Sequence, residues 1–105
     1  MNDKQEYELK VIHSRQKSFY GKAMCMTYKD VVALKSYNTV VVAVNTDTGA
    51  VYFPWRDHSR TTAKHVKEFL MQLDIYDKAL SVMAEKKYKS FAQFMRQCAN
   101  WNYKE

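Results

Sequence analysis

Residues 34–73 constrain the fold of this 105-residue chain more than any other stretch. Residues 40–44 form a continuous apolar run, and the polar segment 45–49 after it ends in a glycine, which favours a hairpin loop. Residues 50–53 then return as a second apolar segment before the only proline. A hydroxyl-rich segment, 59–62, precedes apolar residues at helical spacing. We therefore predict two paired strands followed by a helix, with residues 40–44 as a central strand covered on both faces.

The residues before this stretch also predict strands. Residues 7–12 alternate between apolar and polar side chains, and residues 23–28 and 31–36 are rich in apolar and β-branched side chains. We expect residues 1–6 to be frayed. Residues 14–22 are polar and basic with a glycine near their end, which predicts a loop.

The residues after 73 predict two further helices. Residues 75–83 suit a second helix, and Ser90 is expected to cap a third. The third helix carries one apolar stripe formed by Phe91, Phe94, Met95, Cys98 and Trp101. This stripe either completes the core of a monomer or forms the seam of a homodimer.

The fold class that follows is α+β in a single domain, residues 1–105. We expect an antiparallel meander of four or five strands within residues 7–54. Two or three helices within residues 60–102 are expected to pack on one side of it.

Composition excludes several classes of protein. The longest apolar run is too short to cross a bilayer, and the N-terminus lacks the apolar segment of a secretion signal. We therefore expect a cytoplasmic protein without a membrane partner. Cys25 and Cys98 are too few for a disulfide framework or a zinc site, so buried free thiols are expected. The chain contains only two glycines, fewer than the glycine-rich dinucleotide-binding loop requires. We therefore expect no cofactor.

The net charge of +6 favours acidic partners such as nucleic acid. The basic residues concentrate in segments 13–35, 56–67 and 86–96. The first two segments each contain one acidic residue, and the third contains no acidic residue. Segments so far apart in sequence form one surface only if the fold brings them together.

Residues 59–65 are the stretch most like a catalytic site. Thr61 and His65 are four residues apart on the expected helix, so a hydroxyl and an imidazole could touch, as in a nucleophile pair. The alternative interpretation is a capped helix with His65 beside the core. Asp57, His58 and His65 do not match a zinc-binding spacing. We predict no catalytic residue and no metal ligand, and a small nuclease using His65 or His13 is the weaker alternative.

Aromatic side chains interleaved with basic ones form a better candidate surface. Exposed aromatic rings stack on bases while lysine and arginine contact phosphates, and tyrosine, tryptophan and arginine also dominate protein interfaces. Phe19 and Tyr20 have a second interpretation, as loop anchors tucked against the core. The predicted partner-binding residues are Arg15, Lys17, Phe19, Tyr20, Lys22, Trp55, Arg56, Arg60, Lys64 and Lys67.

Four segments in order resemble a small family of unknown function found in phages, plasmids and other mobile elements of Gram-positive bacteria. They are KSFYGKA at 17–23, LKSYNTVV at 34–41, Trp55, and SRTTAKHVKEF at 59–69. The resemblance covers residues 17–70 and implies a habitat rather than an activity.

Several small accessory proteins of mobile elements inhibit host defences, and this analogy gives the first functional hypothesis. The chain would be a non-enzymatic protein that binds and inhibits a host defence component, such as a Cas9-type CRISPR effector or its RNA complex. The alternative is a nucleic-acid-binding module that uses the basic and aromatic surface.

Overall fold

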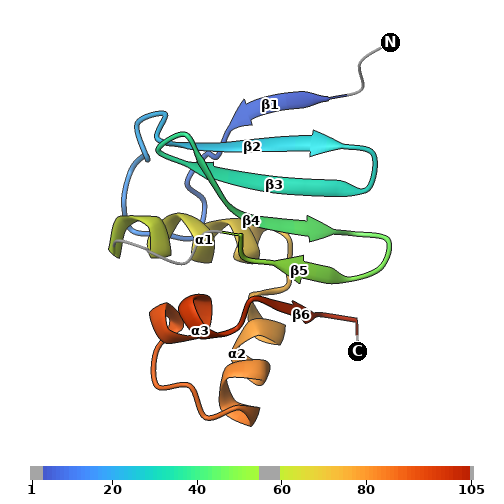
Figure 1. The fold of residues 1–105 in the computed structure, drawn as a ribbon. Helices are drawn as coiled ribbons and strands as arrows, with labels where there is room; N and C mark the ends of the chain where they lie inside the picture. The colour runs from blue at the N-terminus through green and yellow to red at the C-terminus, as the bar shows by residue number, and fades with distance from the viewer. Residues whose placement is uncertain (1–3, 55–59, 105) are drawn as a thin grey trace.

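The computed structural model describes residues 4–54 and 60–104. Within them, six strands form one antiparallel sheet whose spatial order is the order of the sequence (Figure 1). The strands are β1 (Gln5–Glu8), β2 (Ala23–Tyr28), β3 (Val31–Ser36), β4 (Thr39–Asn45), β5 (Ala50–Tyr52) and β6 (Asn100–Asn102). The helices α1 (Arg60–Gln72), α2 (Tyr76–Glu85) and α3 (Phe91–Gln97) lie between β5 and β6 in the chain.

Tight turns with left-handed residues join the central strands. Asn38, between β3 and β4, has a φ of 69°, and Gly49, between β4 and β5, has a φ of 86°. Both are residue types that adopt positive φ at little cost, as the sequence predicted. The loop before Gly49 is further stabilised by Asn45, whose side-chain oxygen accepts the N–H groups of Asp47 and Thr48.

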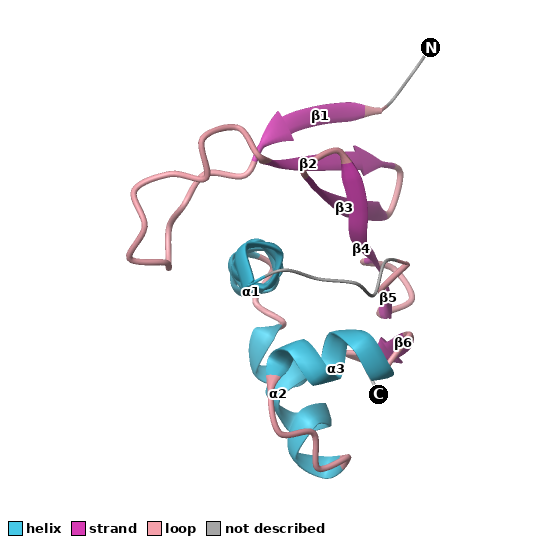
Figure 2. Ribbon diagram, turned by 60° about the vertical axis from the view of Figure 1, so that its left-hand side comes forward, coloured by secondary structure: helices cyan, strands magenta, loops and turns pink. Residues whose placement is uncertain are grey.

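The three helices pack on one face of the sheet (Figure 2). The apolar residues of α1, including Val66, Phe69 and Leu70, are buried against the strands. Phe53 and Phe94 meet edge to face with their ring centroids 5.5 Å apart, which joins the end of β5 to α3. The prediction of an α+β fold with helices on one side is therefore confirmed.

The strand count is higher than predicted because the C-terminus forms a strand. The third helix ends at Gln97, and Cys98 already has an extended backbone. Trp101 pairs with Val51, so β6 covers the edge of β5. This pairing supplies hydrogen-bond partners to β5 and continues just past it, where the Phe53 N–H donates to the Ala99 carbonyl at 2.8 Å. All five residues of the predicted stripe are nonetheless buried in the core of the chain.

Two further predictions about the sheet are wrong. The first strand is Gln5–Glu8 rather than residues 7–12, and residues 5 and 6, expected to be frayed, pair with β2. The central strand β4 is not covered by helices on both faces. Val41 and Val42 are buried in succession because the β3–β4 register shifts between Leu34 and Lys35, which leaves Val41 as an extra residue.

Among residues 4–54 and 60–104, none of the three helices has the length and apolar character needed to span a lipid bilayer.

Candidate functional site

A basic groove runs between α1 and α3. It has a volume of about 440 Å³, and no acidic residue of the described chain lines it. Four of its lining side chains are cationic: Arg60, Lys64 and Lys67 from α1, and Arg96 from α3. The fold thus brings the second and third basic segments of the sequence together, and we call this surface the basic groove.

Helical spacing explains why α1 contributes three cations to one surface. Lys64 and Lys67 are three residues apart, and Arg60 is one turn before Lys64, so all three lie on neighbouring positions of the helix. The opposite side of α1 carries Val66 and Phe69, which are buried in the core. The cations are therefore directed away from the sheet.

The wall of the groove from α3 begins at the capped end of that helix. The Ser90 side chain accepts the N–H of Gln93 at 3.1 Å, which confirms the predicted cap. Phe91 follows it, and the ammonium of Lys67 lies 5.6 Å from the centroid of the Phe91 ring. This contact holds one cation across the groove from α1 to α3.

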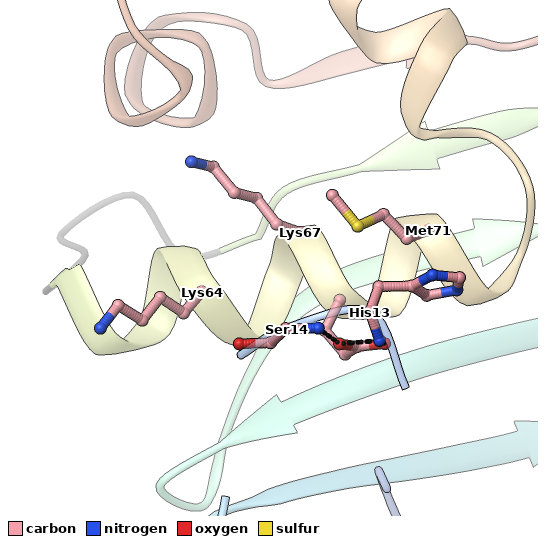
Figure 3. Close-up of a pocket in the computed structure, with 6 residues that line it drawn as sticks. His13, Ser14, Lys64, Lys67 and Met71 are labelled. Atoms are coloured by element: carbon pink, nitrogen blue, oxygen red, sulfur yellow. Dashed lines mark hydrogen bonds between the residues drawn. The ribbon is translucent and has the colours of Figure 1, made fainter. Parts of the chain in front are cut away.

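A second, smaller cavity of about 160 Å³ lies on the other flank of the same lysines (Figure 3). Lys64 and Lys67 line both cavities, and His13, Ser14 and Met71 complete the second one together with Glu68. In Figure 3 Lys67 projects from α1 away from His13 and Ser14. The two lysines therefore form a ridge between the cavities.

Glu68 attaches the loop of residues 9–22 to α1. Its carboxylate accepts the N–H of Ser14 at 2.8 Å and the N–H of His13 at 3.0 Å. Burial alone would raise the pKa of Glu68, but hydrogen bonds from the Gln72 side chain and from the loop backbone outweigh it and lower the pKa. The carboxylate is thus charged and is satisfied by neutral donors rather than by a lysine.

The hydroxyl–imidazole contact that the sequence suggested exists with a different hydroxyl. Nδ1 of His65 lies 2.8 Å from Oγ of Ser36 on β3, and that hydroxyl is also 3.2 Å from Thr62. All three side chains are buried, and His65 is only 1% exposed. Burial and the nearby charge of Lys22 lower the pKa of His65 to about 4. The network joins sheet to helix in the core, where a substrate has no access.

The predicted partner-binding residues separate into groups. Arg60, Lys64 and Lys67 meet in the basic groove. Phe19 is 2% exposed, so its inclusion among the surface residues is wrong and its alternative interpretation as a loop anchor is confirmed. Arg15, Lys17, Tyr20 and Lys22 are exposed on the loop of residues 9–22, and they line neither the basic groove nor the second cavity. Trp55 and Arg56, like Asp57 and His58, lie outside the described residues.

Sequence reasoning missed Arg96, Ser36 and Glu68. The sequence contained a signal for Arg96, because segment 86–96 is basic without an acidic residue. It does not show, however, that α3 faces α1. No sequence pattern marked Ser36 or Glu68 as a site residue, since their hydrogen-bond partners in the core and in the loop lie at least 26 residues away in the chain. Within residues 4–54 and 60–104, no three His, Cys, Asp or Glu side chains form a group that could hold a metal ion.

A model described as "Family of unknown function (DUF8033)" matches residues 7–90 of the chain. This range agrees with the predicted resemblance to a small family of unknown function and extends it beyond residues 17–70. It includes the cations of α1 and ends before Arg96. Neither a curated protein nor a solved structure gives a significant match.

Proposed function

Since this chain belongs to the Family of unknown function (DUF8033), we propose a function from its own geometry: it is a non-enzymatic module that binds the phosphate backbone of a nucleic acid in the basic groove. The observation that carries the proposal is the convergence of Arg60, Lys64, Lys67 and Arg96 on one groove without an acidic residue among its described lining.

Four cationic side chains gathered in one groove attract a polyanion. Four like charges around one groove repel each other, so an anionic ligand is favoured, and its binding releases the cations condensed on a nucleic acid. Lysine and arginine contact phosphates without reading sequence, and the proposal therefore predicts weak sequence preference. Ser90 also lines the groove and adds a hydroxyl to this surface.

The proposed function is tested by fluorescence anisotropy of labelled oligonucleotides across a salt series. Each of Lys64→Gln, Lys67→Gln and Arg96→Gln should weaken binding and reduce the slope of log K against log salt by about 0.7–0.9 per lost phosphate contact. Lys78→Gln is the matched control, because Lys78 is exposed on α2 and lines none of the described cavities. Equal binding by all four variants and the original protein would refute the proposal.

Inhibition of a host defence nuclease is the second candidate, and the basic groove is also the observation that favours it. A Cas9-type effector in the cytoplasm of a bacterial host carries a guide RNA, whose backbone is a ligand of the kind the groove fits. On this proposal, the protein belongs to a phage or plasmid and reduces the cleavage rate of the loaded effector. Arg96→Gln should restore cleavage, whereas Lys78→Gln should not. An unchanged cleavage rate at saturating protein would exclude this candidate.

A further inference from the structure

Two exposed tyrosines outside the basic groove are held in a backbone conformation that bulky residues rarely adopt. Tyr20 has a φ of 53° and Tyr37 a φ of 50°, both in the left-handed region. Each precedes a residue that also has positive φ, Gly21 in one turn and Asn38 in the other. A tyrosine in this conformation is strained relative to asparagine or glycine, and backbone strain of this kind clusters at ligand-binding positions.

The two turns lie side by side. The N–H of Tyr37 donates to the carbonyl of Lys22 at 2.9 Å, and the N–H of Lys22 donates to the carbonyl of Phe19 at 3.0 Å. The ammonium of Lys22 lies 5.6 Å from the centroid of the Tyr37 ring. We call Tyr20, Lys22 and Tyr37 the tyrosine platform.

The platform has a rigid base in the core. The ring of Phe19 lies 4.4 Å from that of His65, centroid to centroid, and the ring of Tyr37 lies 5.7 Å from it. Phe19 and His65 are buried, whereas Tyr20 is 73% exposed and Tyr37 is 48% exposed. The buried pair fixes the turns, and the tyrosines remain available to a ligand.

We propose that the tyrosine platform stacks unpaired bases, so that the ligand of this protein is single-stranded nucleic acid. This inference rests on the proposed function, in which the phosphates occupy the basic groove. Aromatic rings stack on bases only where the bases are not already stacked in a duplex, and a neighbouring cation then contacts the backbone. Lys22 supplies that cation beside Tyr37.

The position of α1 connects the platform to the groove. Tyr37 contacts His65, and Lys64, the residue before His65, lines the groove. On this proposal, a strand bound by Lys64 passes around the first half of α1, from the exposed side that carries Lys64 to the turn of Tyr37. Phosphate contacts in the groove and base contacts on the platform would then belong to one ligand.

The test compares probes that differ in their bases but not in their charge. The probes are an oligouridylate and an oligothymidylate of about 12 nucleotides, a hairpin duplex with the same number of phosphates, and an abasic strand of equal length. We expect both base-bearing single strands to bind more tightly than the duplex and the abasic strand. A preference between uridylate and thymidylate distinguishes RNA from DNA, and either preference supports the proposal.

Tyr20→Asn and Tyr37→Asn remove the rings at positions where asparagine tolerates positive φ, so the turns are retained. Each should weaken binding of the single strands roughly 5- to 150-fold, as expected for one lost stacking contact. Binding of the abasic strand and the slope against salt should not change. Tyr20→Phe and Tyr37→Phe keep the rings and should bind as the original protein does.

The outcomes distinguish base stacking on the tyrosine platform from phosphate binding in the basic groove. If Tyr20→Asn and Tyr37→Asn bind single strands normally while Lys64→Gln and Arg96→Gln do not, the platform is refuted and the basic groove stands. If no probe binds at low salt, both are refuted. Should Tyr37→Asn unfold through its contact with His65, Tyr20→Asn decides the matter, because that side chain is mostly in solvent.

Discussion

The hydroxyl of Ser36 lies 2.8 Å from Nδ1 of His65, which follows it by 29 residues. This contact joins β3 to α1 inside the core, and Thr62 completes the network at 3.2 Å from the same hydroxyl. Buried polar groups stabilise a fold only when they are paired. The network therefore specifies how α1 sits on the sheet, and through α1 it positions the cations of the basic groove.

The stability of the protein should fall on mild acidification because of His65. Its pKa is lowered from the ordinary 6.5 to about 4 in the folded chain, so protonation favours the unfolded chain. The free energy of unfolding should be constant above about pH 6.5 and fall by about 3 kcal/mol between pH 6.5 and 4. Urea unfolding at a series of pH values measures this. The double variant Ser36→Ala/His65→Phe should lose the dependence in that window, and a flat profile for the original protein would contradict the assignment.

Glu68→Gln should destabilise the protein at neutral pH. The amide NH₂ would replace Oε2, which accepts the Gln72 side-chain N–H at 2.8 Å and the N–H of His13 at 3.2 Å. The bonds from His13 and Ser14 to the remaining oxygen would no longer be charge-assisted. We expect a loss of about 1–3 kcal/mol in the free energy of unfolding. Glu85→Gln is the matched control, since Glu85 is exposed at the end of α2.

Acid separates the role of Glu68 from that of His65. Because the pKa of Glu68 is lowered below its ordinary 4.5, its contribution is present above that value and disappears below it. The effect of Glu68→Gln should therefore shrink only at a pH below about 4.5, after most of the His65 effect has occurred. If Glu68→Gln and Glu85→Gln lowered the free energy of unfolding equally at pH 7, Glu68 would not attach the loop of residues 9–22 to α1.

Gly49→Ala and Gly21→Ala form a matched pair that tests the C-terminal strand. Both glycines have positive φ, and alanine at either should cost about 1–2 kcal/mol. A Cβ on Gly49 would also lie 2.5 Å from Oδ1 of Asn102, whereas a Cβ on Gly21 meets no described atom within 4 Å. Gly49→Ala should therefore be less stable than Gly21→Ala by at least about 1 kcal/mol in thermal or urea unfolding. Equal losses would argue that Asn102 does not pack beside Gly49.

Cys25 should resist thiol reagents in the folded protein. It is a buried free thiol, and burial raises its pKa to about 11, although a hydrogen bond with Tyr7 opposes this effect. The thiolate is the reactive form, so at pH 8 neither access nor ionisation favours reaction. A colorimetric thiol assay should show slow modification of native protein and rapid modification in denaturant. Fast reaction of a Cys98→Ser variant under native conditions would contradict the buried position of Cys25.

The sequence by itself determined the local elements. Asn38 and Gly49 predicted turns because few residue types tolerate positive φ, and Ser90 predicted a helix start because its hydroxyl satisfies a free backbone N–H. The apolar spacing of residues 66–73 predicted the buried face of α1. Each of these preferences acts within a few residues, so a single sequence contains it.

Only the tertiary structure decided the C-terminal strand and the composition of the site. Trp101 fits the helical stripe that starts at Phe91, but it pairs with Val51 because the edge of β5 needs hydrogen-bond partners. Phe19 is a core residue, and Arg96 reaches the cations of α1, because of where the sheet places the loop and α3. These outcomes depend on contacts between residues distant in the chain, and no local propensity encodes which surfaces will meet.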